Sequence, residues 1–129
     1  MRRSLQSISL TIAAAVSLAL SIESCVDHSL APGVVVDCSG AETISYVNDV
    51  IPIINTHCAI TGDGGCHNGG NGDDLNWTKL ANLQNHAAEL KVRVTLPPSD
   101  PAHMPRIGIL ELNQIQTLVC WVEQGAKNN

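Results

Sequence analysis

Apolar side chains recur every three or four positions in three stretches of the chain, the spacing that gathers them on one face of an amphipathic helix. The three stretches cover residues 44–58, 78–94 and 113–124. Their apolar positions are Ile44, Val47, Val50, Ile51, Ile54 and Cys58, then Leu80, Leu83, Ala87, Leu90 and Val94, and finally Ile115, Leu118, Val119 and Val122. Because no sheet pattern stands out beside these stripes, we predict an all-α domain of about three helices with long irregular loops.

Two irregular loops separate the predicted helices. The first is rich in glycine and runs from Gly62 to Gly72. The second runs from Leu96 to Pro101 and contains three prolines, each of which biases the residue before it away from helical backbone. This second loop presents His103-Met104-Pro105 in front of the last helix, for which Asn113 is a candidate cap and Gly125 a candidate stop.

The N-terminus has the pattern of an export signal. Met1-Arg2-Arg3 gives it a basic start, and the apolar run from Leu10 to Leu20 is too short to span a bilayer comfortably. The run is followed by an apolar residue, a small residue and then Cys25, which resembles a bacterial lipoprotein cleavage box. We therefore predict lipidation at Cys25, and ordinary cleavage nearby with Cys25 free or paired is the alternative.

These features divide the chain into three parts. Residues 1–24 form a lipoprotein-type signal peptide, residues 25–43 a tether, and residues 44–129 the folded domain. The tether carries Pro32 and Gly33 and has no helical period. Within it, Val34-Val35-Val36 fits either a short strand or an extended segment that packs its valines.

The charge of the chain limits the kinds of partner expected, and its composition indicates how the fold is stabilised. Without Arg2, Arg3 and Glu23, the exported part keeps five Lys and Arg against eleven Asp and Glu, a net charge of −6. Nucleic acid is therefore excluded as an expected partner. The chain has no Phe, one Tyr and two Trp, so its aromatic core is thin, and a cofactor or disulfides are expected to help hold it together.

The first loop contains the residues with the most distinctive chemistry. Cys58 closes the first predicted helix, and Cys66 is followed directly by His67, with seven residues between the two cysteines. This arrangement of residue types is typical of covalent haem binding, in which two thiols bond to the haem and the adjacent imidazole binds its iron. The usual spacing between the two cysteines is two residues. Glycines at positions 62, 64 and 65 allow the longer spacer to bulge while its ends converge.

Other uses of the same residues stay open. An exported chain meets an oxidising compartment, so Cys58 and Cys66 could instead form a disulfide, and Cys38 and Cys120 are also available for pairing. Zinc bound by Cys58, Cys66 and His67 is stereochemically feasible. The single Gly-Gly-x-Gly-x-Asp turn at residues 69–74 resembles a calcium-binding repeat, but one copy does not form a β-roll.

Met104 is the candidate for the second axial position on a haem iron. It is the sole methionine after the signal peptide, and it lies between His103 and Pro105 in the proline-rich loop rather than on an apolar helix face. A thioether favours ferrous iron and raises the reduction potential, as electron transfer requires. His103 and His86 are the alternative ligands, and Trp121 either lines a haem crevice or belongs to the core of the last helix.

The segments Ile44–Cys58, Cys66–Gly70, His103–Pro105 and Ile115–Asn129 together resemble the small c-type cytochrome domains of exported bacterial proteins. In that family a helix ends in the haem cysteine, followed by a Cys-His loop, a Met-Pro loop and a closing helix that ends in Trp-x-x-x-Gly-Ala. The resemblance covers about residues 44–129. It implies the cytochrome c-like form of the predicted all-α fold, with one covalently bound haem c.

The resemblance also implies roles for individual residues. They are covalent haem binding by Cys58 and Cys66, iron ligation by His67 as the proximal and Met104 as the distal ligand, and a disulfide between Cys38 and Cys120. That disulfide would join the two ends of the domain.

The expected function is outer-sphere electron transfer by a monohaem cytochrome at the bacterial cell envelope, not enzymatic catalysis. The chain would be exported and held in the periplasm or at the outer membrane by a lipid on Cys25, and its acidic surface would favour a redox partner with a basic docking face. The alternative is a haem-free, disulfide-stapled lipoprotein that acts as an interaction or accessory module.

Overall fold

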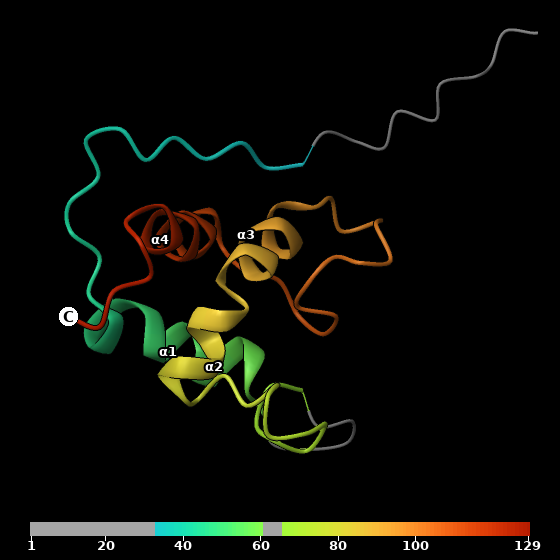
Figure 1. Ribbon diagram of the computed structural model, residues 1–129. Coiled ribbons are helices and arrows are strands. Elements are labelled where there is room, and N and C mark those ends of the chain that lie inside the picture. The colour runs from blue at the N-terminus through green and yellow to red at the C-terminus, as the bar shows by residue number, and fades with distance from the viewer. Residues whose placement is uncertain (1–32, 61–65) are drawn as a thin grey trace, which may run out of the picture.

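The computed structural model describes residues 33–60 and 66–129 (Figure 1). The predicted signal peptide and the lipidation site Cys25 lie outside these residues, as do the five residues before Cys66. All regular structure in the described part is helical, with no strand, so the all-α fold class is confirmed. No helix of this part is both long enough and apolar enough to cross a membrane.

The first helical stretch is continuous but mostly wound as π-helix. It comprises η1 (Tyr46–Val50), α1 (Ile51–Ile53) and η2 (Ile54–Cys58). Backbone N–H groups donate to the carbonyl five residues earlier, as from Ala59 to Ile54 at 2.7 Å. Ser45 caps the start, because its side-chain oxygen accepts a hydrogen bond from the backbone N–H of Asn48.

The buried face of this stretch differs in part from the predicted stripe. Val50, Ile54 and Cys58 are buried as predicted, whereas Val47 is 59 % exposed. Tyr46, which was not among the predicted apolar positions, is buried and lies four residues before Val50, on the same face. The predicted helix is therefore right in position, and its inward face is partly wrong.

The second predicted helix is two helices, α2 (Leu80–Asn85) and α3 (Ala87–Thr95), which meet at His86. The backbone of His86 has φ −102° and ψ 11°, outside the helical region, and this interrupts the hydrogen-bond ladder. Most of the predicted apolar stripe is nevertheless buried across the break. Its buried members are Leu83, Ala87, Leu90 and Val94.

The last helix, α4 (Leu112–Glu123), lies within two residues of its expected position. Its N-cap is Glu111 and not the expected Asn113. The Glu111 side chain accepts a hydrogen bond from the backbone N–H of Gln114, and the Gln114 side chain accepts one from the backbone N–H of Glu111. Gly125, at φ +94°, ends the helix as expected. Its N–H donates to Val122 O, and the N–H of Ala126 donates to Trp121 O, a Schellman arrangement.

The core lies where α4 packs against α3 and against the first helical stretch (Figure 1). Trp121 is fully buried at its centre and stacks on Tyr46, with ring centroids 5.8 Å apart. The indole Nε1 of Trp121 donates to Lys127 O at 2.9 Å, which also ties the C-terminal residues to α4. Trp121 is therefore a core residue, the second of its two interpretations.

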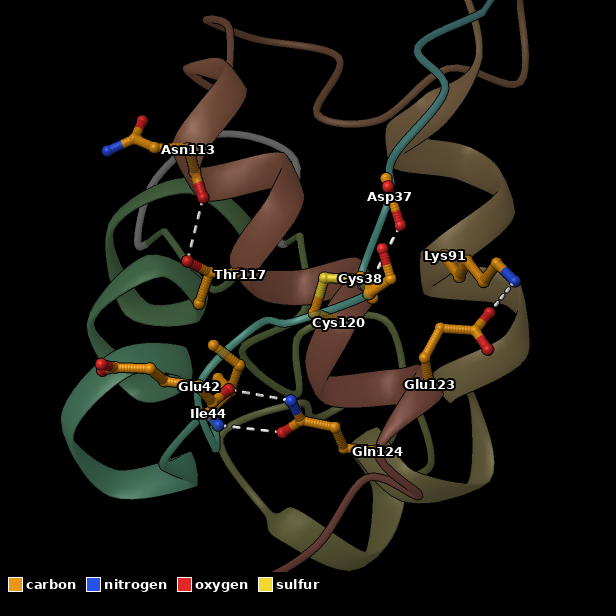
Figure 2. Close-up of a disulfide and its surroundings, with 11 residues drawn as sticks. Asp37, Cys38, Glu42, Ile44, Lys91, Asn113, Thr117, Cys120, Glu123 and Gln124 are labelled. Atoms are coloured by element: carbon orange, nitrogen blue, oxygen red, sulfur yellow. Dashed lines mark hydrogen bonds and ion pairs between the residues drawn. A yellow bond between two sulfur atoms is a disulfide. The ribbon is translucent and has the colours of Figure 1, made fainter.

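Residues 33–43 run along the domain rather than away from it (Figure 1). They have no regular secondary structure and turn at Ser39-Gly40. The N–H of Val34 donates to Thr95 O at 2.8 Å, and Val34 and Val36 pack on the core. Figure 2 shows the disulfide that joins Cys38 of this segment to Cys120 of α4, the pairing that the resemblance implied. From Gly33 onward the segment expected as a tether thus belongs to the packed domain.

Candidate functional site

Cys58, Cys66, His67 and Met104 line one cavity of about 280 Å³. They come from the end of η2, from the glycine-rich loop that follows it, and from the loop before α4, which is far from the other two in the sequence. Its walls are mostly apolar, with contributions from Leu75, Trp77, Leu90, Val94 and Pro105. The residues that the sequence singled out for haem binding therefore meet in one apolar pocket.

Two hydrogen bonds fix the ends of the spacer between the cysteines. The N–H of His67 donates to Cys58 O at 2.8 Å, and the side-chain amide of Asn68 donates to Ile60 O at 2.9 Å. Cys66 is the neighbour of His67 in the chain, so these bonds bring the Cys66 backbone close to Cys58. The convergence that the glycine-rich spacer was expected to permit is present at both of its ends.

The His67 ring is held flat against Trp77. The two ring centroids are 3.5 Å apart with an interplanar angle of 15°, and the N–H of Trp77 donates to His67 O at 3.0 Å. Burial lowers the pKa of His67, because the charged imidazolium loses hydration there. A backbone hydrogen bond with Leu75 acts in the opposite direction, and burial is the larger of the two effects. The imidazole is thus held neutral, the form in which it binds a metal.

Met104 is fixed to α3 through Arg93. The N–H of Met104 donates to Arg93 O at 3.1 Å, and the Arg93 guanidinium donates to Ala102 O at 3.3 Å. Glu89 in turn holds that guanidinium, with its Oε1 2.6 Å from Arg93 Nε. The proline-rich loop therefore presents the thioether to the cavity from a backbone position anchored on a helix.

The two alternative ligands lie elsewhere. His103 is outside the cavity, and its Nδ1 is 2.7 Å from Leu96 O. His86 is also outside it, and its ring nitrogens face Asp74 Oδ2 at 3.0 Å and Glu89 Oε2 at 3.2 Å. Of the three candidates for the distal position, the structure brings Met104 alone to the cavity that His67 lines.

Trp77 is one of the cavity residues that the sequence did not single out, and His57, Arg93 and Arg106 are others. Trp77 follows the glycine-rich loop, lies on no helix and belongs to no apolar stripe, yet it is only 2 % exposed. Trp121, which had been considered for the crevice, does not line the cavity. Only the composition could have indicated burial of Trp77, because tryptophan side chains are highly buried on average and the chain has two of them.

Cys58 and Cys66 are free thiols, whereas Cys38 and Cys120 are bonded. Burial, together with the nearby Cys66, raises the pKa of Cys58 to about 12. The structure thus assigns one cysteine pair to the fold and leaves the second pair available at the cavity.

The raised pKa of Cys58 predicts that its thiol alkylates slowly in the haem-free chain. Three pKa units above the ordinary value of 9.0 reduce the thiolate fraction at neutral pH about a thousandfold, so Cys58 should react with iodoacetamide far more slowly than an unperturbed cysteine peptide. Peptide mass spectrometry over a time course after mild reduction measures the rate. Equal rates for Cys58 and the reference peptide would contradict the burial seen here.

His86 is predicted to titrate above its ordinary pKa of 6.5. Hydrogen bonds to Asp74 and then Glu89 raise the pKa of His86, because both carboxylates favour the imidazolium. The stabilisation is therefore complete below pH 6.5 and is lost as the pH rises through the raised value. NMR titration should show the pKa of His86 falling back toward 6.5 in Asp74→Asn, whereas an unchanged value would rule out this ion pair.

The rival metal sites are not assembled in the described residues. No three His, Cys, Asp or Glu side chains gather there as metal ligands, so the zinc site of Cys58, Cys66 and His67 is not formed. In the calcium-like turn, Asp73 pairs with Lys79 and Asp74 with His86. Both aspartates are thus engaged in ion pairs, as expected of a solvated loop.

Comparisons with protein-family models, curated proteins and solved structures give no match for this chain. A haem c fits the donor set: two thiols, a neutral imidazole and a thioether line one apolar cavity.

Proposed function

We propose that the chain is a monohaem c-type cytochrome that transfers electrons at the bacterial cell envelope. The observation that carries the proposal is the meeting of Cys58, Cys66, His67 and Met104 at one apolar cavity, although 46 positions separate the first from the last. Neither a plain disulfide nor a surface histidine would require a thioether at the same pocket. In this proposal the Cys66-His67 pair and the Met104-Pro105 loop both bind the haem.

Each residue has a distinct task in this proposal. Cys58 and Cys66 would form the thioether bonds to the porphyrin, and His67 and Met104 would bind its iron. A bound haem would supply an iron that cycles between the ferric and ferrous states. The stacking of His67 on Trp77 and the anchoring of Met104 to Arg93 would keep both donors in place during that cycle, so little reorganisation is needed.

The chain around the site would control water and partners. Leu75, Leu90, Val94 and Pro105 keep the cavity apolar, which favours the thioether ligand and a higher reduction potential. The net charge of −6 after removal of the signal peptide would steer a partner with a basic docking face. Anchoring through a lipid on Cys25 would place this exchange at the membrane surface.

Expression of the full chain in a host with export and haem-maturation machinery tests the proposal. The expected product is red, and its Soret and α bands stay with the protein through acid–acetone extraction. In Met104→Ala the covalent bands should persist while the reduction potential falls, because the thioether that favours ferrous iron is gone. His67→Ala should lose the low-spin spectrum altogether.

The alternative is a haem-free accessory lipoprotein. The disulfide between Cys38 and Cys120 favours it to the extent that it staples the domain without a cofactor. Colourless protein from the same host, with a second disulfide between Cys58 and Cys66 on peptide mapping, would establish this alternative and overturn the electron-transfer proposal.

A further inference from the structure

The turn after the glycine-rich loop contains an acceptor sequence for N-linked glycosylation. Asn76-Trp77-Thr78 is the sole place in the chain where serine or threonine follows an asparagine by two positions. With a residue other than proline between them, this triplet marks a glycosylation site on the surface of exported proteins. The N-terminal sequence predicts export for this chain. Such triplets also arise by chance, so accessibility and side-chain geometry decide whether Asn76 suits the modification.

The side chains of this triplet divide between the interior and the surface. Trp77 is 2 % exposed, lines the cavity and stacks on His67. Asn76 is half-buried and Thr78 is exposed. Asp74, two positions before Asn76, is also exposed. Burial of Trp77 thus holds the turn on the domain, while the residues on both sides of it stay accessible to an enzyme.

The Asn76 side chain is held through its oxygen and not through its nitrogen. The backbone N–H of Thr78 donates to Asn76 Oδ1 at 3.2 Å, and the Thr78 hydroxyl donates to the same oxygen. Asn76 Nδ2 forms no hydrogen bond with the described residues, whereas the amide nitrogen of Asn68 donates to Ile60 O. The amide nitrogen, which is the atom that carries the sugar in N-linked glycosylation, is therefore not occupied.

Gly69 leaves room beside that nitrogen. Its φ of +97° lies in the left-handed region that favours glycine. A Cβ built at this position would lie 3.0 Å from Asn76 Nδ2, which is tight contact. The glycine that the backbone requires thus also keeps the approach to the amide nitrogen open on the side of the glycine-rich loop.

We propose that Asn76 is glycosylated after export, with a lipid-pyrophosphate-linked oligosaccharide as the donor. Asn76 Nδ2 forms a bond to the anomeric carbon of the first sugar, and the bond from that carbon to the pyrophosphate oxygen breaks. The lipid pyrophosphate leaves with the electron pair, and the amide nitrogen releases one proton. Because Oδ1 takes no part in the new bond, it can still accept both hydrogen bonds from Thr78. The proposal requires export of the chain but not haem.

Expression of the full chain tests the proposal in a host with export and haem-maturation machinery, a bacterial oligosaccharyltransferase and a lipid-linked oligosaccharide of known mass. Intact-mass spectrometry should show one added oligosaccharide, and peptide mapping should place it at Asn76. The same host without the transferase should give the unmodified chain. Loss of the signal peptide in the same spectrum reports export.

Four variants show whether the triplet is what the enzyme recognises. Asn76→Gln removes the amide nitrogen from its place, and Thr78→Val removes the hydroxyl, so both should lose the added mass completely. Thr78→Ser keeps a hydroxyl and should retain the modification. Asn85→Gln is the matched control, because it changes an exposed asparagine of α2 that has no serine or threonine two positions on. Circular dichroism checks that each variant keeps its helices.

The outcomes separate this proposal from the electron-transfer function. A glycosylated but colourless chain would support the modification and contradict haem binding, and a red, exported chain without the oligosaccharide would do the reverse. An oligosaccharide that persists in Asn76→Gln would overturn the assignment to this site. A chain that keeps its signal peptide and stays inside the cell would overturn both proposals, because both require export.

Discussion

A chain in which Cys58 and Cys66 are both alanine is expected to leave the export pathway without covalently bound haem. The two thiols are the free cysteines of the described chain, and both line the cavity that His67 and Met104 share. Without them nothing at the cavity can form a thioether to a porphyrin vinyl group. Intact-mass spectrometry and acid–acetone extraction should show loss of all covalent haem.

The single variants Cys58→Ala and Cys66→Ala show whether both thiols are used. Each should retain haem on one thioether, with a pyridine haemochrome band shifted from that of the unaltered protein because one vinyl group stays unreacted. Thr56→Ala, an exposed change in the same turn as Cys58, is the matched control and should load normally. Full loading of the double variant would contradict covalent attachment at these positions.

Removal of the disulfide between Cys38 and Cys120 is expected to cost about 4 kcal/mol of the free energy of unfolding. The bond closes a loop across a sequence separation of 82, and on the chain-entropy account this restricts the unfolded chain strongly. The loss is a large part of the 5–15 kcal/mol that is typical of a small domain. Urea unfolding of Cys38→Ala/Cys120→Ala should show it as a lower midpoint.

Neighbouring contacts on the same side of α4 provide the control. Figure 2 shows the exposed ion pair between Lys91 and Glu123 close to the disulfide. Lys91→Met should cost less than about 1 kcal/mol, because solvent and salt screen exposed ion pairs. If the double cysteine variant lost no more stability than Lys91→Met, the disulfide would contribute little to the free energy of unfolding. Packing and the hydrogen bonds of Gln124 with Glu42 and Ile44 would then hold residues 33–43.

The sequence predicts the helices of this chain well and their details less well. Periodicity located all three helical stretches, because burial of an apolar stripe dominates helix placement. It missed the π-winding of residues 46–58, since a stripe of Val50, Ile54 and Cys58 fits either kind of helix. It also missed the break at His86, where a pair with Asp74 in the preceding loop and a local pair with Glu89 accompany a departure from helical backbone.

Prediction of the site from the sequence depended on residue chemistry. Cys58, Cys66, His67 and Met104 were selected because thiols beside an imidazole and a methionine in a proline-rich loop are unusual, and the structure brings them together. Trp77 was not selected, since it lies in no motif and on no apolar stripe. Its place in the cavity wall comes from tertiary contacts such as its stacking on His67, which neither periodicity nor motifs report.

The paired hydrogen bonds from His67 to Cys58 and from Asn68 to Ile60 also bear on the spacing of the two cysteines. They hold the two ends of the intervening segment together, so the positions of the thiols do not depend on the number of residues in it. Each doubling of a loop's length costs only about 0.6 kcal/mol of closure entropy. A longer or shorter segment is therefore expected to cost the fold little, and any constraint on its length would come from the machinery that recognises the chain.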